Sequence, residues 1–467
     1  MQLLLTSTMM VGIAFPVLSL GATAAAEAQA PVRPDATRSA QTGPPLFSAA
    51  VLPELRGSTD IETPTAIATS GASYSSAGTD YPVVPALPAE PKMAEQGVRR
   101  QASELGDYEP DGIRFGSFLL YPSLTFLGTV TDNVDSAEHR TMGQLGTVEA
   151  AISIRSDWDR HALELNGRTG FTGYQQPARK PENEQQIDGE LLLELSDQTD
   201  VTLRGRADRT KEEESSIELI TSGKQAAITT NLNGGVQIDH DAGQLQLQFR
   251  GGIDLADFED DPARDYKTYR LGGRVGWKAT DQVTPFVDVE VSRKIYDIRP
   301  NSEDGDSLRG ALGLAVINRD KLSGEVSFGA MQWRPDAKGQ KDDNILFADA
   351  SLRWSPDALW VLTGGLETSL TSTSTAATSV ATHAVRLGAD YAARRNLTIG
   401  FDGRVARNTY RGSNLRDWEY DATLSAEYSL SRYTKLTINA VHEGREGNIP
   451  ASDYRANKLQ LGVTFQR

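Results

Sequence analysis

The sequence predicts one transmembrane, antiparallel, up-and-down β-barrel of about eighteen strands, with sixteen as the alternative count. Three observations lead to this prediction. Apolar and polar residues alternate from about residue 113 to the C-terminus, short turns and longer polar loops join these segments in turn, and aromatic residues lie at the segment ends. Strict alternation places one set of side chains on each face of a strand. Here one face is apolar and the other is charged, amide or hydroxyl.

The composition helps to separate a membrane barrel from a soluble β-sandwich, which would hide its apolar faces in a core. Hydrophobic residues make up 39% of the 467-residue chain, the mean hydropathy is −0.40, and no apolar run is long enough for a spanning helix. A barrel needs only one apolar face on each strand, so low hydropathy is compatible with membrane residence. The net charge of −16 argues against nucleic acid as a partner, and the absence of cysteine excludes disulfides and thiolate chemistry.

The N-terminal quarter has a different composition. An apolar stretch at 9–22 and small residues at 22–28 predict a signal peptide over 1–28, although no Lys or Arg precedes Arg33, so the true start codon is left open. Residues 29–111 are rich in Pro, Ala, Ser and Thr, which predicts a disordered periplasmic segment. This interpretation is favoured over a folded plug. The barrel is expected over 112–467.

The strands follow one another in a regular rhythm. The first three are expected at 113–131, near 144–157 and at 161–174. Short turns then mark the strand ends at 197–200, 240–243, 280–282, 318–321, 355–358, 393–395 and 430–432. Longer loops are expected at 175–184, 211–224, 259–265, 298–305, 334–342, 371–378, 411–415 and 446–452. An even strand count puts the short turns on the side of the chain termini, which is the periplasmic side in bacterial barrels.

Aromatic residues give an independent indication of the membrane boundaries. One group lies beside the short turns: Trp158, Trp277, Trp354, Trp360, Tyr391, Tyr428 and Tyr433. A second group lies beside the long loops: Tyr174, Phe258, Tyr266, Tyr296, Trp333, Tyr410, Trp418 and Tyr454. Two aromatic belts at the level of the lipid headgroups are typical of membrane barrels.

The last strand carries the expected closing signal. Alternating apolar residues end on an aromatic residue two positions before the C-terminus: Leu459, Leu461, Val463 and Phe465. This pattern predicts recognition by the barrel-assembly machinery and pairing of the last strand with 113–131.

Two stretches resemble a known family. Residues 112–124 followed by 130–134, and the strand and turn at 269–283, are similar to sequences of the outer-membrane β-barrel porin family of type two, from Gram-negative bacteria. The resemblance covers roughly 112–467. It implies an outer-membrane location in contact with lipid and lipopolysaccharide, and no catalytic site. Some members of the family lie in exopolysaccharide gene clusters, so a component of exopolysaccharide export or assembly is the alternative function.

The polar face predicts the lining of a lumen. Six basic residues are expected on one wall: Arg204, Arg206, Arg250, Arg270, Arg274 and Lys278. Four acidic residues are expected on a distant wall: Glu419, Asp421, Glu427 and Glu443. Facing walls of opposite charge would set up a transverse field that selects polar solutes. The alternative is local pairing with carboxylates such as Asp208, Asp254, Asp288 and Glu290.

No arrangement of residues predicts catalysis, a cofactor or a metal site. The five histidines lack metal-ligand spacing, Asp239-His240-Asp241 falls in a short turn, and Ser379 lies too far along the strand to serve His383. We therefore expect a porin-like channel for passive diffusion of small polar solutes and no enzyme activity. A soluble secreted β-rich adhesin is the third hypothesis. The solute, the ion selectivity and the oligomeric state are left open.

Overall fold

The computed structural model describes residues 108–467 apart from 177–178, 213–215, 224, 299–303, 319–320, 338, 373–378 and 450–451. The predicted signal peptide and all but the last four residues of the predicted disordered segment therefore lie outside the described residues. Among those described, no helix is both long enough and apolar enough to cross a membrane.

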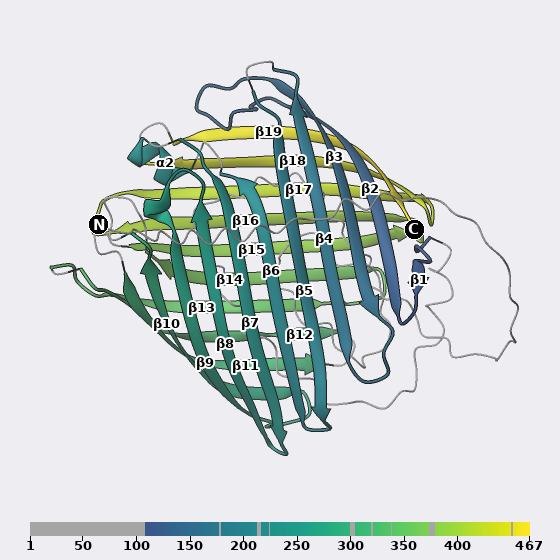
Figure 1. Ribbon diagram of the computed structural model, residues 1–467. Coiled ribbons are helices and arrows are strands. Elements are labelled where there is room, and N and C mark those ends of the chain that lie inside the picture. Colours follow the sequence, from purple (N-terminus) through teal and green to yellow (C-terminus); the bar gives the residue numbers. More distant parts are fainter. Residues whose placement is uncertain are drawn as a thin grey trace, which may run out of the picture. The chain divides into compact units, whose positions relative to one another are not determined.

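Eighteen long strands form one antiparallel sheet that closes on itself (Figure 1). Each pairs with its neighbours in the chain, and the last, β19, pairs with the first long strand, β2. The strands are β2 Phe118–Thr131, β3 Gly143–Ser156, β4 Ala162–Tyr174, β5 Glu182–Ser196, β6 Thr199–Lys211, β7 Ile228–Ala242, β8 Leu245–Phe258, β9 Tyr266–Trp277, β10 Val283–Tyr296, β11 Gly305–Asn318, β12 Leu322–Pro335, β13 Asp343–Trp354, β14 Trp360–Thr371, β15 Ser379–Arg394, β16 Leu397–Arg411, β17 Arg416–Ser431, β18 Thr434–Gly447 and β19 Tyr454–Gln466.

The count of eighteen and the alternation of short turns with long loops confirm the predicted fold class. The predicted first strand, 113–131, is divided. Gly116 adopts φ +60°, a conformation that glycine takes at little cost, and separates the short strand β1 (Ile113–Phe115) from β2. β1 pairs with residues 118–120 of β2 and β19 with residues 123–131, so both lie along the same edge of β2.

The sheet is apolar outside and polar inside, the reverse of a soluble protein. On β9, Tyr269, Leu271 and Val275 are 47%, 65% and 50% exposed, whereas Thr268 and Arg274 on the opposite face are 3% and 4% exposed. An exposed apolar band on a closed sheet is stable only against lipid, because water would have to solvate it. The outer face of the sheet is therefore suited to contact with a lipid bilayer.

The aromatic prediction is confirmed for five of seven residues beside the short turns and is wrong for five of eight residues beside the long loops. Beside the short turns, five of the predicted residues are exposed: Trp277, Trp354, Trp360, Tyr428 and Tyr433. Beside the long loops, five are buried: Phe258, Tyr266, Tyr296, Trp333 and Tyr410. Each of these five belongs to one of three hydrophobic clusters at the long-loop end. They do not form a lipid-facing belt, because their position in the alternation places them on the inner face.

Asp132, just after β2, ties the closing pair of strands together beyond its last ladder bond. Its carboxylate accepts hydrogen bonds from the backbone N–H and the Nδ2 of Asn457, both at 2.7 Å, and Arg140 lies 3.3 Å away. Partial burial raises the pKa of Asp132, but these donors outweigh it and the net pKa is lowered.

A lowered pKa in the folded state gives a defined pH dependence. The stabilisation is present above the unfolded-state pKa and is lost as pH falls through the folded-state pKa. We expect Asp132→Asn to destabilise the barrel at neutral pH and to flatten its loss of stability between about pH 5 and pH 3. Urea unfolding in detergent, followed by the heat-modifiable gel shift, measures both. Asp281→Asn, at an exposed position in a short turn, is the control. Equal pH profiles for Asp132→Asn and the wild type would contradict the assignment.

Candidate functional site

The candidate site is the charged inner face of the sheet. The structure places five of the six predicted basic residues on that face: Arg204 and Arg206 on β6, Arg250 on β8, and Arg270 and Arg274 on β9. Lys278 lies one residue beyond β9, in a short turn. The six residues thus come from β6, β8, β9 and the turn after β9, within one run of four consecutive strands.

Four of these cations pair with carboxylates close to them. Arg204 Nε lies 2.8 Å from Glu190 Oε2, and Arg206 Nε lies 3.2 Å from Asp208 Oδ1. The other two pairs are Arg270 with Asp254 and Lys278 with Asp241. The local pairing considered as the alternative to a basic wall is therefore present at these positions.

The remaining two basic residues belong to a buried network centred on Asp288. The carboxylate of Asp288, 1% exposed, accepts hydrogen bonds of 2.9 Å from Arg250 Nη2 and from Arg274 Nε. Arg274 also donates through Nη1 to Glu325 Oε2 at 2.8 Å, and its guanidinium lies 3.9 Å from the centre of the Phe286 ring. Charges removed from water in this way are stable only as a complete set, because the desolvation of each one must be offset by its partners.

Sequence reasoning missed Glu325 on β12, and also Arg309 on β11, which pairs with Asp349 of β13 and lies 3.9 Å from Asp288. The alternation does place Glu325, Arg309 and Asp349 on the inner face. What the sequence does not contain is the registration of one strand against the next, and this decides which inner-face charges meet.

The predicted acidic wall is also largely paired. Glu419 Oε1 accepts a hydrogen bond of 2.7 Å from Arg445, whose side chain is 1% exposed. Glu427 lies 2.8 Å from Lys435 Nζ, and Glu443 lies 2.7 Å from Lys458 Nζ. Asp421 differs from these three, because its carboxylate forms no direct ion pair or hydrogen bond with any residue that the structure describes.

Two neighbouring aspartates on the inner face resemble Asp421, because their carboxylates also lack a direct partner. The carboxylates of Asp390 on β15 and Asp402 on β16 also face the lumen, and neither carboxylate forms an ion pair or hydrogen bond within the described part of the chain. In the ladder between β15 and β16, Asp390 lies opposite Gly400 and Asp402 lies opposite Gly388. On their other sides Asp390 lies opposite Val361 and Asp402 opposite Thr423, so no cation stands directly across from either carboxylate. Arg386 and Arg404 act on Asp402 and Asp421 at longer range. The inner face of β15–β17 thus carries three carboxylates that lack a direct counter-charge.

The residues considered for catalysis do not come together. His240 Nδ1 lies 2.9 Å from Thr199 Oγ1, while Asp239 accepts hydrogen bonds from two glutamine side chains. Ser379 donates to Asp343, and His383 Nδ1 lies 3.3 Å from Thr368 Oγ1, so Ser379 and His383 do not pair. Among the described residues, no group of three or more His, Asp or Glu side chains is placed to hold a metal ion.

The chain matches one protein-family model, described as Putative beta-barrel porin 2, over residues 106–467. No curated protein matches it in sequence. Among solved structures it is similar to the outer membrane protein OpdK from Pseudomonas aeruginosa, with 12% identity and a TM-score of 0.42 over 74% of this chain and 99% of that one. OccK2 (OpdF) from the same organism has 12% identity and a TM-score of 0.41, covering 75% and 97%. The siderophore receptor PirA, also from Pseudomonas aeruginosa, has 11% identity and a TM-score of 0.38, covering 76% and 81%.

Proposed function

Because the chain belongs to the Putative beta-barrel porin 2 family, we propose that this outer-membrane β-barrel is a channel for passive diffusion of small polar solutes, with a preference for cations. A closed ring of sixteen to eighteen strands encloses room for water. The polar inner face supports the proposal, because the charged, amide and hydroxyl side chains along it suit water and polar solutes. No catalytic step is part of the proposal.

The single observation that carries the cation preference is the unequal neutralisation of the lumen charges. The six predicted basic residues each have a carboxylate partner, whereas Asp390, Asp402 and Asp421 have none in direct contact. Paired charges largely cancel at a distance, so the field beside β15–β17 is set by these three carboxylates and by Arg386, an inner-face cation that also has no direct ion pair among the described residues. Three negative charges against one positive charge leave this region net negative. A ring or row of carboxylates favours cations over anions in a pore. The transverse field expected between a basic and an acidic wall is replaced in this proposal by a local negative field beside β15–β17.

Single-channel recording tests both parts of the proposal. Purified protein, shown to be folded by its heat-modifiable gel mobility, is added to a planar bilayer with a KCl gradient. We expect discrete conductance steps and a reversal potential of the sign that cation preference gives. A folded barrel that never conducts would overturn the channel, and a reversal potential of the opposite sign would overturn the cation preference.

The orientation and the partners are part of the same proposal. We infer that the short-turn end faces the periplasm, that residues 29–111 lie there after removal of a signal peptide, and that the long loops meet lipopolysaccharide. The barrel-assembly machinery is the expected partner during insertion, through the strand that ends at Phe465. Short turns on the side of the C-terminus support this orientation. Cleavage of the N-terminal segment by protease added to intact cells would contradict it. The alternative role in exopolysaccharide export rests on the family resemblance alone and is not favoured.

A further inference from the structure

Within the ring of strands, β13 and β14 share the smallest number of paired residues. These two strands pair through five residue pairs only, from Ala350 opposite Leu366 to Trp354 opposite Leu362. The closing pair of β19 and β2 has nine, and every other neighbouring pair in the ring has more. Towards the long loops, residues 343–349 of β13 pair with β12 alone, and residues 367–371 of β14 pair with β15 alone.

Between Leu366 and the long loops, where β14 no longer pairs with β13, side chains on the outward face of β14 and β15 become buried. On β14, Leu366 is 42% exposed, but Thr368 and Leu370 on the same face are 5% and 7% exposed. On β15, Val385 is 45% exposed, whereas Ala381 on the same face is 3% exposed. Side chains that face lipid lower down the strands are therefore covered by protein near the long loops.

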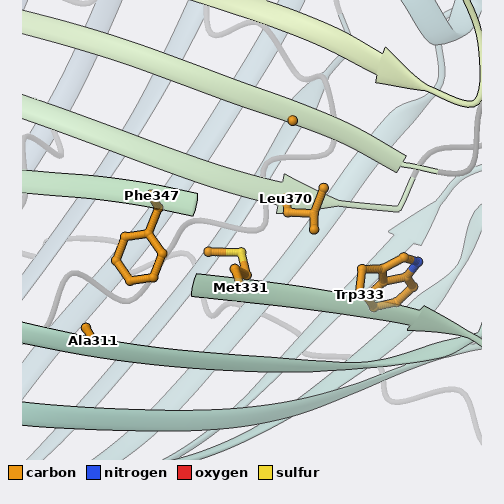
Figure 2. Packing of buried hydrophobic residues seen from close by; sticks show 6 residues of the cluster. Ala311, Met331, Trp333, Phe347 and Leu370 are labelled. Carbon is orange, nitrogen blue, oxygen red and sulfur yellow. The ribbon is translucent and has the colours of Figure 1, made fainter. Parts of the chain in front are cut away.

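The covering residues come from the inner face of the neighbouring strands. Leu370 packs in one cluster with Met331 and Trp333 of β12 and Phe347 of β13 (Figure 2). Phe347 is 4% exposed, and Leu346 beside it, on the outer face of β13, is 80% exposed. We call residues 367–371 of β14 and 379–381 of β15 the β14–β15 end. Its outward face thus packs against the inward face of β12 and β13. It follows that this end of β14–β15 lies inside the ring.

Polar contacts hold the end of β14–β15 in this inner position. Ser379 Oγ, at the start of β15, donates to Asp343 Oδ2 of β13 at 2.6 Å. Ser372, just after β14, lies with its Oγ 3.1 Å from the hydroxyl of Tyr296, which is buried on the inner face of β10. Both contacts join the β14–β15 end to the inner faces of β10 and β13, which lie across the interrupted pairing between β13 and β14.

The opposite side of the same end meets the loop between β6 and β7. Val380 packs against a hydrophobic cluster that includes Ile217, the first residue of helix α2 (Ile217–Ser222) in that loop. Ile217 also packs with Tyr410 of β16 and Ile449 of the loop between β18 and β19. Helix α2 therefore contacts strands that are remote from β6 and β7 around the ring, close to the long-loop end of β15.

The register of the pairing between β13 and β14 defines a second possible position of the β14–β15 end. If the pairing between β13 and β14 continued in its present register, Asp349, Ala348 and Leu346 would lie opposite Glu367, Thr368 and Leu370. Leu346 and Leu370 would then share the lipid-facing side of the sheet. The strands are still adjacent where they separate, because Thr368 N donates to Asp349 Oδ1 at 2.8 Å and Thr368 Oγ1 to the Ala348 carbonyl at 3.4 Å.

We propose that the β14–β15 end is a gate with two positions: a tucked position, seen here, in which it lies inside the mouth, and a zipped position, in which it completes the ladder with β13 and widens the mouth. The tucked position gains apolar burial around Leu370, and the zipped position gains backbone hydrogen bonds along β13 and β14. Two arrangements that exchange one kind of contact for another are typical of switching elements. The proposal rests on the channel function proposed above, because a gate requires a pore.

Two disulfides can hold the two positions, and the absence of native cysteine gives a clean background. Asp343→Cys/Ser379→Cys joins residues whose side chains touch only in the tucked position. Leu346→Cys/Leu370→Cys joins residues that are opposite each other only in the zipped position, at a spacing that suits a disulfide. Leu312→Cys/Phe328→Cys, directly opposite on the continuous ladder of β11 and β12, is the matched control.

Bond formation is scored by gel mobility with and without reductant, and conductance is recorded before and after reduction. We expect all three bonds to form, the tucked bond to lower the step conductance until it is reduced, the zipped bond to raise it, and the control bond to leave it unchanged. Failure of the Leu346→Cys/Leu370→Cys bond to form, or equal conductance in both locked states, would overturn the gate. Failure of the Asp343→Cys/Ser379→Cys bond would contradict the tucked position. Bonds that form in a barrel that never conducts, locked or reduced, would overturn the channel instead, so the two failures are distinguishable.

Discussion

Replacing Arg274 by methionine is expected to lower the free energy of unfolding by about 3–5 kcal/mol, as removal of one member of a buried ion pair does elsewhere. The side chain of Arg274 is 3% exposed and bonds to Asp288 and Glu325 at once. Without it Glu325 is a desolvated carboxylate with no cation in contact among the described residues, and Asp288 depends on Arg250 and on the more distant Arg309. Methionine keeps most of the volume against Phe286, so the loss reports the charge rather than a cavity. Urea unfolding of the barrel in detergent measures the change.

Two further variants isolate the cause. Arg204→Met removes an arginine of the same inner face whose ion pair with Glu190 is 39% exposed on each side, and it is expected to cost about 0–1 kcal/mol. Arg274→Met/Glu325→Met removes both partners, and most of the lost stability should return because no uncompensated charge remains at that contact. A single Arg274 variant no less stable than the Arg204 variant would show that the buried network does not stabilise the barrel.

The triple substitution Asp390→Asn/Asp402→Asn/Asp421→Asn is expected to abolish most of the cation preference while leaving the barrel folded. Each change removes one negative charge and keeps the size of the side chain. None of the three carboxylates has an ion pair to lose, so the folded state should be preserved or stabilised. The field beside β15–β17 disappears, and the selectivity that depends on it falls with it. The shift of the reversal potential towards zero in a KCl gradient measures the effect.

A charge-matched control shows whether position or total charge is responsible. Asp257→Asn/Asp260→Asn/Asp281→Asn removes the same charge from exposed positions at the strand ends and in the turns, away from the inner face of β15–β17. This variant should keep the wild-type reversal potential at physiological ionic strength, where screening acts over about 8 Å. Equal shifts in the two triple variants would mean that the overall charge of the protein, and not the unpaired lumen carboxylates, sets the selectivity.

The sequence predicted the strands well because each strand reports its own two faces. A period of two survives whatever the strand pairs with, so the alternation of Leu459, Leu461 and Val463 identifies a strand and its lipid-facing side without knowledge of its neighbours. The same signal was available for Tyr266, which shares its face with Thr268 and Arg270. It was misassigned because its place beside a long loop was given more weight than its position in the alternation.

The partners of the lumen charges could not be predicted in the same way. Arg274 bonds to Asp288, 14 residues away, and to Glu325, 51 residues away, across two hairpins. Whether a particular arginine meets a particular carboxylate depends on the registration of several consecutive strands, and a shift of a single residue changes the partner. The sequence could thus place six cations on one wall, but it could not show that they are neutralised there and that Asp390, Asp402 and Asp421 are not.

By itself, then, the sequence predicted a barrel of about eighteen strands, with sixteen as the alternative, together with the inner and outer faces of those strands and the side of the barrel on which the loops are long. These are local properties, fixed by alternation and by turn length along the chain. The tertiary structure alone decided which lumen charges meet, that the aromatic residues at the long-loop end close around one another, and that β14 leaves β13 to lie inside the mouth. These depend on contacts between strands, where burial of Leu370 against Met331 and Phe347 competes with backbone pairing, and no local pattern records the outcome of that competition.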